Sequence, residues 1–594
     1  MRTVLEHQHL FPLGERLGPD SLYVERDTDI HNFEQWLAWI PRGLAQSRAL
    51  VARAGSGKST FLQRLFNRLW QQRTDCVPFY YEIPAASIWL PNLAEHYFRV
   101  FASHYLAFRL MKPDRVTQLY DFKDIARIAE AQQLHAIAED VHQLQVFFSG
   151  GRNDQAAELA FSAPHRYAQI FKTPVVVLLD EFQRLGTVVT SDALKQVREP
   201  SAVSFFEPWL ASKSAPALLA LSRRGRQAAM IDPLVRAGAV TLYDWDPCLS
   251  FEEGLEAVFR YAQDYNVGLT NESALLLNSI TQGDAWTIAQ VVRRAGRAAL
   301  DLDSSAAVKQ AVTRVMSERD EVLALSWMLA FESSALDLDD PLMRRLLFVF
   351  TDRAGKDWSV AQLLEHLELD ETQETALQTR LDMLHNAGLI LTTTRHRVYQ
   401  GHRDPTLQLV LHQRFAPEGG AARVLEPVYR HRLKSLRKHY PTLESLLHKV
   451  SPRFAALQLG YDMRERAEFT LDTYFDHLDD ASVFRVGRVF WQYVAEKRIG
   501  DKCRFDLKIT DQKGRVLLVD VICGERWVDV DTVHDFLSRI RFFREAEGTA
   551  ETFAGLLALE GFSPNALKLC AENQIGVTTQ LRYLRTTWSE EALN

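Results

Sequence analysis

The sequence has little cysteine and no cysteine pattern. Its 594 residues include 5 cysteines, and no two of them form a Cys-x-x-Cys pair. The scattered positions exclude a disulfide framework and a zinc finger, and they favour a reducing compartment. We therefore expect a cytoplasmic protein.

Long apolar runs and an excess of positive charge are also absent. No apolar run reaches the roughly 18–20 residues that a membrane span needs, and residues 1–9 lack the apolar core of a signal peptide. We therefore expect no membrane association. The formal net charge is -7, so any binding to nucleic acid must come from a local basic patch.

Residues 52–60 have the composition of a phosphate-binding loop. They read Ala-Arg-Ala-Gly-Ser-Gly-Lys-Ser-Thr, follow the apolar residues 49–51 and precede a segment with helical apolar spacing. A strand, a small-residue loop ending in Gly-Lys-Ser and a helix are what such a loop requires. Backbone amides and the helix N-terminus would bind a polyphosphate. Lys58 would contact its β- and γ-phosphates, and the Ser59 hydroxyl would ligate Mg²⁺.

The strict pattern has glycine where this chain has Ala52, and a turn before a surface helix is the alternative interpretation. The predicted nucleotide-binding residues of the loop are Arg53, Ala54, Gly55, Ser56, Gly57, Lys58, Ser59 and Thr60.

A second segment places two carboxylates at the end of an apolar run. Residues 174–179 read Pro-Val-Val-Val-Leu-Leu, which predicts a parallel strand buried on both faces, and Asp180 and Glu181 follow. Asp180 would hold Mg²⁺ through water, and Glu181 would orient and deprotonate the water that attacks the γ-phosphate. Two acids that only cap the next helix are the alternative. Together with the loop, the pair of acids indicates a nucleoside triphosphate hydrolase.

Another apolar strand is predicted at residues 217–221, followed by Ser222 and Arg223. In a parallel sheet this end faces the nucleotide, where a hydroxyl and a guanidinium can detect the γ-phosphate. An arginine here could instead reach a neighbouring subunit of an ATP-dependent homo-oligomer, and a solvent-facing arginine is the third possibility.

These segments resemble the STAND class of P-loop ATPases. Leu221-Ser222-Arg223 resembles the sensor-1 arginine of that class, and Val24-Glu25-Arg26 resembles the motif that it places near the adenine. Residues 243–250 and 281–288 resemble the entry and the glycine turn of the helical lid, with Asp284-Ala285 where Asn-Pro is more usual. The resemblance implies ATP and Mg²⁺ as cofactors, with Val24 and Arg26 beside the base.

Within this class, the run 179–185 (Leu-Asp-Glu-Phe-Gln-Arg-Leu) and the domain order look most like the archaeal-type ATPase family. That family adds a winged-helix domain. Here helices are predicted from 342, from 359 and over 371–386, and residues 389–394 and 397–400 should form a hairpin. Residues 403–411, which begin Arg-Asp-Pro, resemble the motif that follows this domain in the family.

The third predicted helix of that domain has the wrong charge for DNA. Winged helices often insert this helix into the major groove, but here Glu371, Glu374 and Asp382 accompany a single basic residue, Arg380. We therefore expect a structural or protein-contacting role. The stretch from Arg423 to Arg453 is different, because it carries eight basic and two acidic residues. Helical phasing would place its residues 430, 434, 437 and 438 on one face, either to contact DNA phosphates or as a solvated surface.

The last part alternates strands and helices and resembles the restriction-endonuclease-like fold that ends many archaeal-type ATPases. In that resemblance Asp506 and Asp520 are the two acids that ligate Mg²⁺, and Glu496 is the upstream acid. The lysine position holds Ile522, which cannot activate water, although Lys508 lies two residues from Asp506. We therefore expect a degenerate domain that binds nucleic acid or acts as a scaffold, with an active nuclease as the less favoured alternative.

The sequence therefore predicts an α/β protein built on a P-loop NTPase parallel sheet. The expected domains are the ATPase core (1–250), a helical lid (251–335), the winged helix (336–418), a basic helical connector (419–480) and the endonuclease-like domain (481–594). The predicted function is an Mg²⁺-dependent ATPase that acts as a nucleotide-controlled switch associated with DNA. The alternatives are a STAND-type signalling switch without DNA and an ATP-gated nuclease.

Overall fold

The structure is a computed structural model that describes most of the chain. The described residues are 12–17, 22–24, 26–71, 76–86, 88–188, 202–222, 230–317, 322–333, 336–337, 339–353, 355–392, 397–401, 404–414, 429–432, 434, 452–478, 483–498, 501–523, 527–548 and 551–579. Among them, no helix is both long and apolar enough to cross a membrane.

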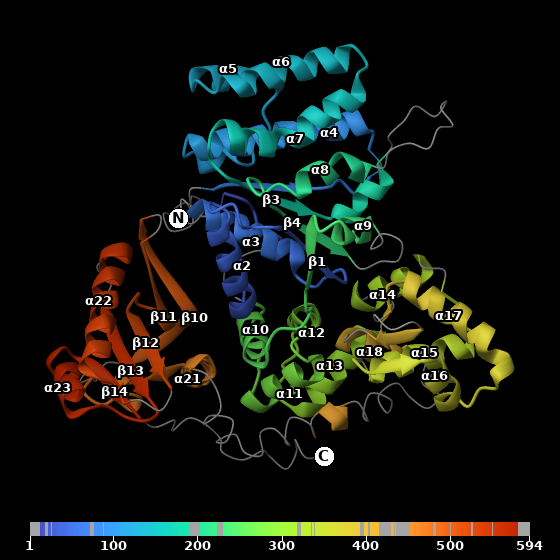
Figure 1. Cartoon of the computed structure of the whole chain (residues 1–594). Coiled ribbons are helices and arrows are strands. Elements are labelled where there is room, and N and C mark those ends of the chain that lie inside the picture. Colours follow the sequence, from blue (N-terminus) through green and yellow to red (C-terminus); the bar gives the residue numbers. More distant parts are fainter. Residues whose placement is uncertain are drawn as a thin grey trace.

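A five-stranded parallel sheet organises the N-terminal part (Figure 1). Its strands are β1 (Ser47–Ala52), β2 (Val77–Glu82), β3 (Val175–Asp180), β4 (Ala217–Ser222) and β5 (Val240–Asp244). Their spatial order is β2-β3-β4-β1-β5, and every neighbouring pair is parallel. The predicted α/β fold class and the strands expected around residues 49, 77, 174 and 217 are confirmed. Because β4 separates β1 from β3, the carboxyl ends of these three strands meet at one edge.

Helices cover this sheet, and four of them form an insertion between β2 and β3. Around the sheet lie α2 (Asp27–Trp39), α3 (Lys58–Gln71), η3 (Phe182–Thr187), η4 (Ala202–Phe205), α8 (Glu207–Leu210) and α9 (Asp232–Arg236). The insertion contains α4 (Leu90–Arg109), η2 (Pro113–Arg115), α5 (Phe122–Ala131), α6 (His135–Ser149) and α7 (Asn153–Ile170). Figure 1 shows α4 and α7 next to the sheet, with α5 and α6 stacked outside them.

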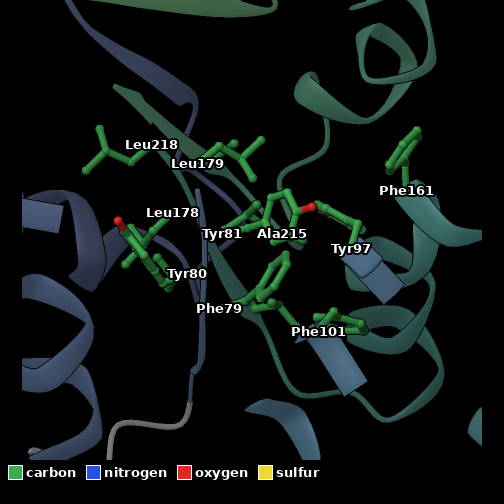
Figure 2. Close-up of a cluster of buried hydrophobic side chains, with 14 of the residues drawn as sticks. Phe79, Tyr80, Tyr81, Tyr97, Phe101, Phe161, Leu178, Leu179, Ala215 and Leu218 are labelled. Carbon is green, nitrogen blue, oxygen red and sulfur yellow. The ribbon is translucent and has the colours of Figure 1, made fainter. Parts of the chain in front are cut away.

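Strand β2 has an aromatic core on one face and Tyr80, which contacts Asp180, on the other. Phe79 has no exposed surface, and its ring lies 5.1 Å from that of Tyr97 and 5.0 Å from that of Phe101, both on α4. Figure 2 shows these rings pointing toward one another, with Tyr80 on the other side of the strand. This alternation follows from the two-residue period of a strand. It leaves the hydroxyl of Tyr80 facing the elements that build the nucleotide site.

The middle of the chain is helical, with one small antiparallel sheet. The first group is α10 (Phe251–Asp264), α11 (Asn271–Thr281), α12 (Ala285–Arg297), α13 (Ser305–Ser317) and α14 (Val322–Ser333). The second is α15 (Pro341–Asp352), β6 (Asp357–Ser359), α16 (Val360–His366), η6 (Glu371–Gln373), α17 (Glu374–Asn386), β7 (Ile390–Thr392), β8 (Val398–Gly401) and α18 (Pro405–Arg414). The three expected helices and the hairpin are confirmed. Strand β6 completes a sheet of order β6-β8-β7 and was not predicted, because three residues are too short to show a pattern.

The C-terminal part is a six-stranded mixed sheet of order β14-β13-β12-β11-β10-β9. It contains α21 (Pro452–Arg466), β9 (Glu468–Phe469), η7 (Leu471–Thr473), β10 (Phe484–Arg498), β11 (Asp501–Asp511), β12 (Val516–Ile522), α22 (Val530–Glu547), β13 (Thr552–Ala558), α23 (Pro564–Glu572) and β14 (Ile575–Thr578). The alternating strands and helices expected from the sequence are therefore present. In Figure 1 this sheet, in red, and the yellow helices α15–α18 lie on opposite sides of α10–α13.

Helix α10 joins the C-terminal sheet to the N-terminal part. Its Phe259 ring lies 4.6 Å from that of Tyr461 on α21, and its Arg260 donates hydrogen bonds of 2.7 Å to the carbonyl oxygens of Tyr23 and Trp491. Beside them Arg453 of α21, which is 7% exposed, contacts Glu256 of α10 at 2.5 Å and Asp27 of α2 at 2.7 Å. A buried guanidinium requires such carboxylate partners. The contact therefore fixes α21 against both α10 and α2.

Candidate nucleotide-binding site

The predicted phosphate-binding loop lies between β1 and α3. Gly55 and Gly57 have φ angles of +77° and +86°, a backbone conformation in which glycine is favoured. The Lys58 ammonium donates to the carbonyl oxygens of Ala52 (2.9 Å) and Arg53 (2.8 Å) and to the Ser56 hydroxyl (3.2 Å). The first residue of a helix therefore places its cation inside the curve of the loop. This is where a polyphosphate would replace the carbonyl oxygens as the acceptor.

Ser59 and Asp180 meet at the edge of the sheet. The Ser59 hydroxyl lies near the buried Asp180 carboxyl, which accepts a 3.0 Å hydrogen bond from the Tyr80 hydroxyl. Burial raises the pKa of Asp180, while the hydroxyls of Ser59 and Tyr80 act in the opposite direction. A hydroxyl and a carboxylate from separate elements are oxygen ligands of the kind that Mg²⁺ prefers. The donor set at this point therefore fits the predicted metal.

Glu181 has an unusual backbone conformation immediately after β3. Its φ is +56° and its ψ is 37°, which turns the chain from the strand into η3. One carboxylate oxygen accepts a 2.7 Å hydrogen bond from the Gln183 side-chain amide and lies 3.3 Å from the Arg184 guanidinium. Left-handed conformations of residues other than glycine are costly and concentrate at functional sites. The two predicted carboxylates have different partners, Tyr80 of β2 for Asp180 and Gln183 of η3 for Glu181.

Two residues near this edge were missed by the sequence interpretation. The Arg16 guanidinium donates to the Ser59 hydroxyl at 3.2 Å and forms an ion pair with Glu82, at the end of β2. Tyr80 is the donor to Asp180 described above. No local pattern marks Arg16, because it precedes the first described helix and contacts residues far away in the sequence. Tyr80 is one of two neighbouring tyrosines in β2, and nothing in the strand's sequence distinguishes it from Tyr81.

Side-chain contacts connect the segment around Arg26 with the phosphate-binding loop. Arg26 pairs with Asp29 at 2.5 Å, and its guanidinium lies 4.2 Å from the centre of the Trp245 ring. The Trp245 indole N–H donates to the Ser56 carbonyl oxygen at 2.7 Å. The segment predicted to lie near the adenine, with buried Val24 and with Arg26, is thus connected to the phosphate loop through Trp245.

Ser222 ends β4 between the loop and the two carboxylates. It is 8% exposed, and its backbone N–H donates to the Gln183 side-chain oxygen at 3.1 Å. Arg223, predicted as the γ-phosphate sensor, lies outside the described residues. Its role stays a prediction.

Arg53 connects the loop with two segments much further along the chain, one at the start of α12 and one before α18. Its guanidinium is 10% exposed, forms an ion pair with Asp284 at the start of α12, and lies 2.8 Å from the carboxylate of Asp404 before α18. The Thr406 hydroxyl also donates to Asp284, at 2.9 Å. Trp286 covers the loop, because a Cβ added at Gly55 would lie 2.5 Å from its ring. We call this set of contacts, formed by Arg53, Asp284, Asp404 and Thr406, the loop junction.

The candidate metal ligands of the C-terminal sheet are adjacent but already paired. Asp506 accepts hydrogen bonds from the Gln492 amide (3.0 Å) and the Val521 backbone N–H (2.8 Å), and its own backbone N–H donates to Asp520. The Arg539 guanidinium of α22 lies 2.5 Å from the Asp520 carboxylate. Burial raises the pKa of Asp520 to about 6, and Arg539 opposes that shift. Arg539 supplies the positive charge that a metal ion would supply in a nuclease.

Lys508 does not face this pair of acids. Its ammonium lies 2.5 Å from the Glu547 carboxylate of α22, which also accepts the Tyr493 hydroxyl hydrogen bond. Burial lowers the pKa of Lys508 to about 8 and raises that of Glu547 to about 7. Within the described residues, no three His, Cys, Asp or Glu side chains form a group that could hold a metal ion. The side chain of Glu496 lies outside the described residues.

The predicted basic stretch from Arg423 to Arg453 is described only in part. Arg430 and Lys434 are exposed, as a face contacting phosphates requires. Arg432 is buried and donates to the Gln408 side chain at 2.5 Å, and Arg453 is buried in its contact with α10. The other basic residues of the stretch lie outside the described residues.

Comparisons with known proteins give structural likenesses only. No protein-family model and no curated protein matches the sequence. A Walker-type ATPase of Pyrococcus abyssi is 12% identical with a TM-score of 0.42, over 68% of this chain and 99% of its own. The ORC2 protein of Aeropyrum pernix is 14% identical with a TM-score of 0.36, over 73% and 98%. RuvB of Thermotoga maritima, a Holliday junction branch migration motor, is 12% identical with a TM-score of 0.28, over 64% and 92%.

The two loop glycines allow a matched test of the contact with Trp286. Gly57→Ala adds a Cβ to open space at positive φ, and we expect it to lower the free energy of unfolding by about 1–2 kcal/mol. Gly55→Ala adds the same backbone strain and a collision with Trp286, for which we expect a further loss of about 1–3 kcal/mol. Denaturant unfolding without nucleotide measures both variants. Equal losses would show that Trp286 does not pack on the loop.

Proposed function

We propose that the chain is an Mg²⁺-dependent ATP hydrolase that acts as a nucleotide-controlled switch. The observation that carries the proposal is the meeting of Lys58, Ser59 and Asp180 at one edge of the parallel sheet, from segments far apart in the sequence. An ammonium and a hydroxyl at the start of a helix, with a buried carboxylate at the end of a strand, are the groups that a nucleoside triphosphate and its metal require.

Each residue has a separate role in the proposed reaction. The loop amides and Lys58 would bind the phosphates, and Ser59 and Asp180 would hold the metal. When bound, Mg²⁺ neutralises charge on the phosphate oxygens. Glu181 would accept the proton of the attacking water. It follows Asp180 directly, but its backbone turns at φ +56° and its carboxylate has a different partner, Gln183.

The loop junction supports the switch. Arg53 belongs to the phosphate loop, whereas Asp284 and Asp404 belong to the start of α12 and the start of α18. A change in the loop on nucleotide binding would alter the partners of a guanidinium that is nearly buried. Because an unpaired buried charge is costly, α12 and α18 would have to follow.

For the remaining parts we propose the modules that the sequence indicated. Helices α15–α17 with β6–β8 would form a winged-helix module, and β10–β14 with α22 and α23 an endonuclease-like module. We propose that this C-terminal half associates with DNA, supported by the exposed residues Arg430 and Lys434.

A second candidate is a signalling switch that assembles protein partners without DNA. It is favoured by the burial of Arg432 and Arg453, which removes two of the eight basic residues from any phosphate contact. DNA-stimulated turnover with a steep dependence on salt supports the first candidate. Oligomerisation that needs ATP and is indifferent to DNA supports the second.

Turnover by three forms of the chain tests the hydrolase. We expect the native chain to hydrolyse ATP with Mg²⁺, and we expect Lys58→Ala to lose both nucleotide binding and turnover. Glu181→Gln should bind ATP normally and lose turnover by about 10²–10⁴-fold, because an amide cannot accept the proton. The rates are measured with and without duplex DNA. Equal rates in all three forms would exclude this site as the hydrolytic centre.

Release of nucleotide tests the loop junction. Arg53→Met removes the guanidinium that Asp284 and Asp404 share, and we expect faster dissociation of a fluorescent ADP analogue by about tenfold. Arg166→Met is the matched control, because Arg166 also pairs with a largely buried aspartate, Asp140, but within the helical insertion. A rate for Arg53→Met equal to that of the control would contradict the switch while leaving hydrolysis untouched.

Incubation with linear duplex DNA tests the nuclease alternative. We expect no cleavage with Mg²⁺ or Mn²⁺, because Arg539 neutralises Asp520 and Ile522 stands at the lysine position. The control is Asp506→Ala, which should behave as the native chain does. Metal-dependent cutting that disappears in Asp506→Ala would instead support the ATP-gated nuclease.

A further inference from the structure

Gln183 connects the predicted catalytic carboxylate with the end of the neighbouring strand. It is 4% exposed and lies in η3, two residues after Glu181. Its side-chain nitrogen donates to the Glu181 carboxylate at 2.7 Å, and its side-chain oxygen accepts from the Ser222 backbone N–H at 3.1 Å. One buried amide therefore spans the ends of β3 and β4.

The two partners fix the orientation of this amide. A backbone N–H can only donate, so the oxygen of Gln183 must face Ser222. The NH₂ group must then face Glu181, where it can only donate. The arrangement thus holds the Glu181 carboxylate at a fixed place relative to the end of β4.

The other charged groups around Glu181 do this less directly. The Arg184 guanidinium lies 3.3 Å from the same carboxylate oxygen, but it also pairs with Glu82 at 3.1 Å and donates to the Ile83 carbonyl oxygen. Its charge is therefore divided between two carboxylates. Asp180 precedes Glu181 in the chain, accepts its backbone N–H at 2.9 Å and adds a like charge nearby. Gln183 makes the shorter contact and has the more fully buried side chain.

We propose that Gln183 is a positioning residue for hydrolysis: it holds the Glu181 carboxylate at a fixed place relative to the end of β4. The inference rests on the proposed hydrolase and assigns a role that the motif alone does not give. Because Ser222 is the other anchor of the amide, a displacement of the end of β4 would also displace Gln183 from Glu181. The activity of the base would then depend on the position of the strand that ends beside the γ-phosphate.

Two substitutions of similar size separate this role from packing. Gln183→Met fills the same volume without either hydrogen bond, and we expect kcat to fall by about tenfold or more with nucleotide affinity unchanged within about twofold, as part of the effect of a general base. Gln183→Glu keeps the acceptor for Ser222 but sets a second carboxylate against Glu181. We expect kcat to fall with affinity kept here too, because the donor to Glu181 is lost while the acceptor for the Ser222 backbone N–H remains.

The experiment measures turnover at saturating Mg²⁺–ATP, together with affinity for ATP, in the full chain. Gln458→Met is the matched control, since Gln458 is a buried glutamine on α21 (2% exposed). If the native chain binds ATP without hydrolysing it, the proposed function fails and this inference with it. If the native chain hydrolyses ATP but Gln183→Glu keeps the native kcat, the inference alone fails. It also fails if Gln183→Met loses affinity and turnover together, or if it loses no more turnover than Gln458→Met.

Discussion

A guanidinium removed from water must keep its carboxylate partners, and Arg53 shows how far this constraint reaches. Its position in the phosphate loop is set by β1 and α3, yet its partners Asp284 and Asp404 begin helices in the two following parts of the chain. The positions of the loop, the start of α12 and the start of α18 therefore depend on one another. Trp286, two residues after Asp284, adds a packing constraint at Gly55. The phosphate loop is therefore also the point where the middle of the chain is attached to the N-terminal sheet.

The sequence predicted the elements better than the contacts between them. The strands that end beside Arg53, at Asp180 and at Ser222 are short apolar runs with clear ends, so local patterns predicted that they exist and run parallel. Their order in the sheet came from the structure alone. The roles assigned to the loop residues and to the two acids rest on the same patterns and stay predictions. Arg16 and Arg539 were not identified, because each contacts a residue far away in the sequence and carries no motif of its own. Gln183 belongs to the run 179–185, but the run alone does not show that its side chain bonds both Glu181 and Ser222.

The C-terminal sheet illustrates a second limit. From the sequence, Asp506 and Asp520 are candidate metal ligands, and the structure does bring them together. Only the structure shows Arg539 of α22 paired with Asp520 and the Lys508 ammonium bound to Glu547. The Arg539 guanidinium balances the charge of the Asp520 carboxylate without a metal ion. The same residue pattern is thus compatible with a catalytic centre and with a structural one, and the deciding residue comes from another element.

The attachment of the C-terminal sheet to α10 has a consequence for how such contacts are inherited. Arg260 donates to two main-chain carbonyl oxygens, those of Tyr23 and Trp491, and Gln263 donates to that of Val489. A carbonyl oxygen is present whichever side chain the residue carries. Substitutions at these three acceptor positions can therefore preserve the bonds, and no compensating change in α10 is needed. A search for pairs of positions that change together in evolution would pass over these three bonds and would detect the interface only through its side-chain pairs, such as Arg453 with Glu256.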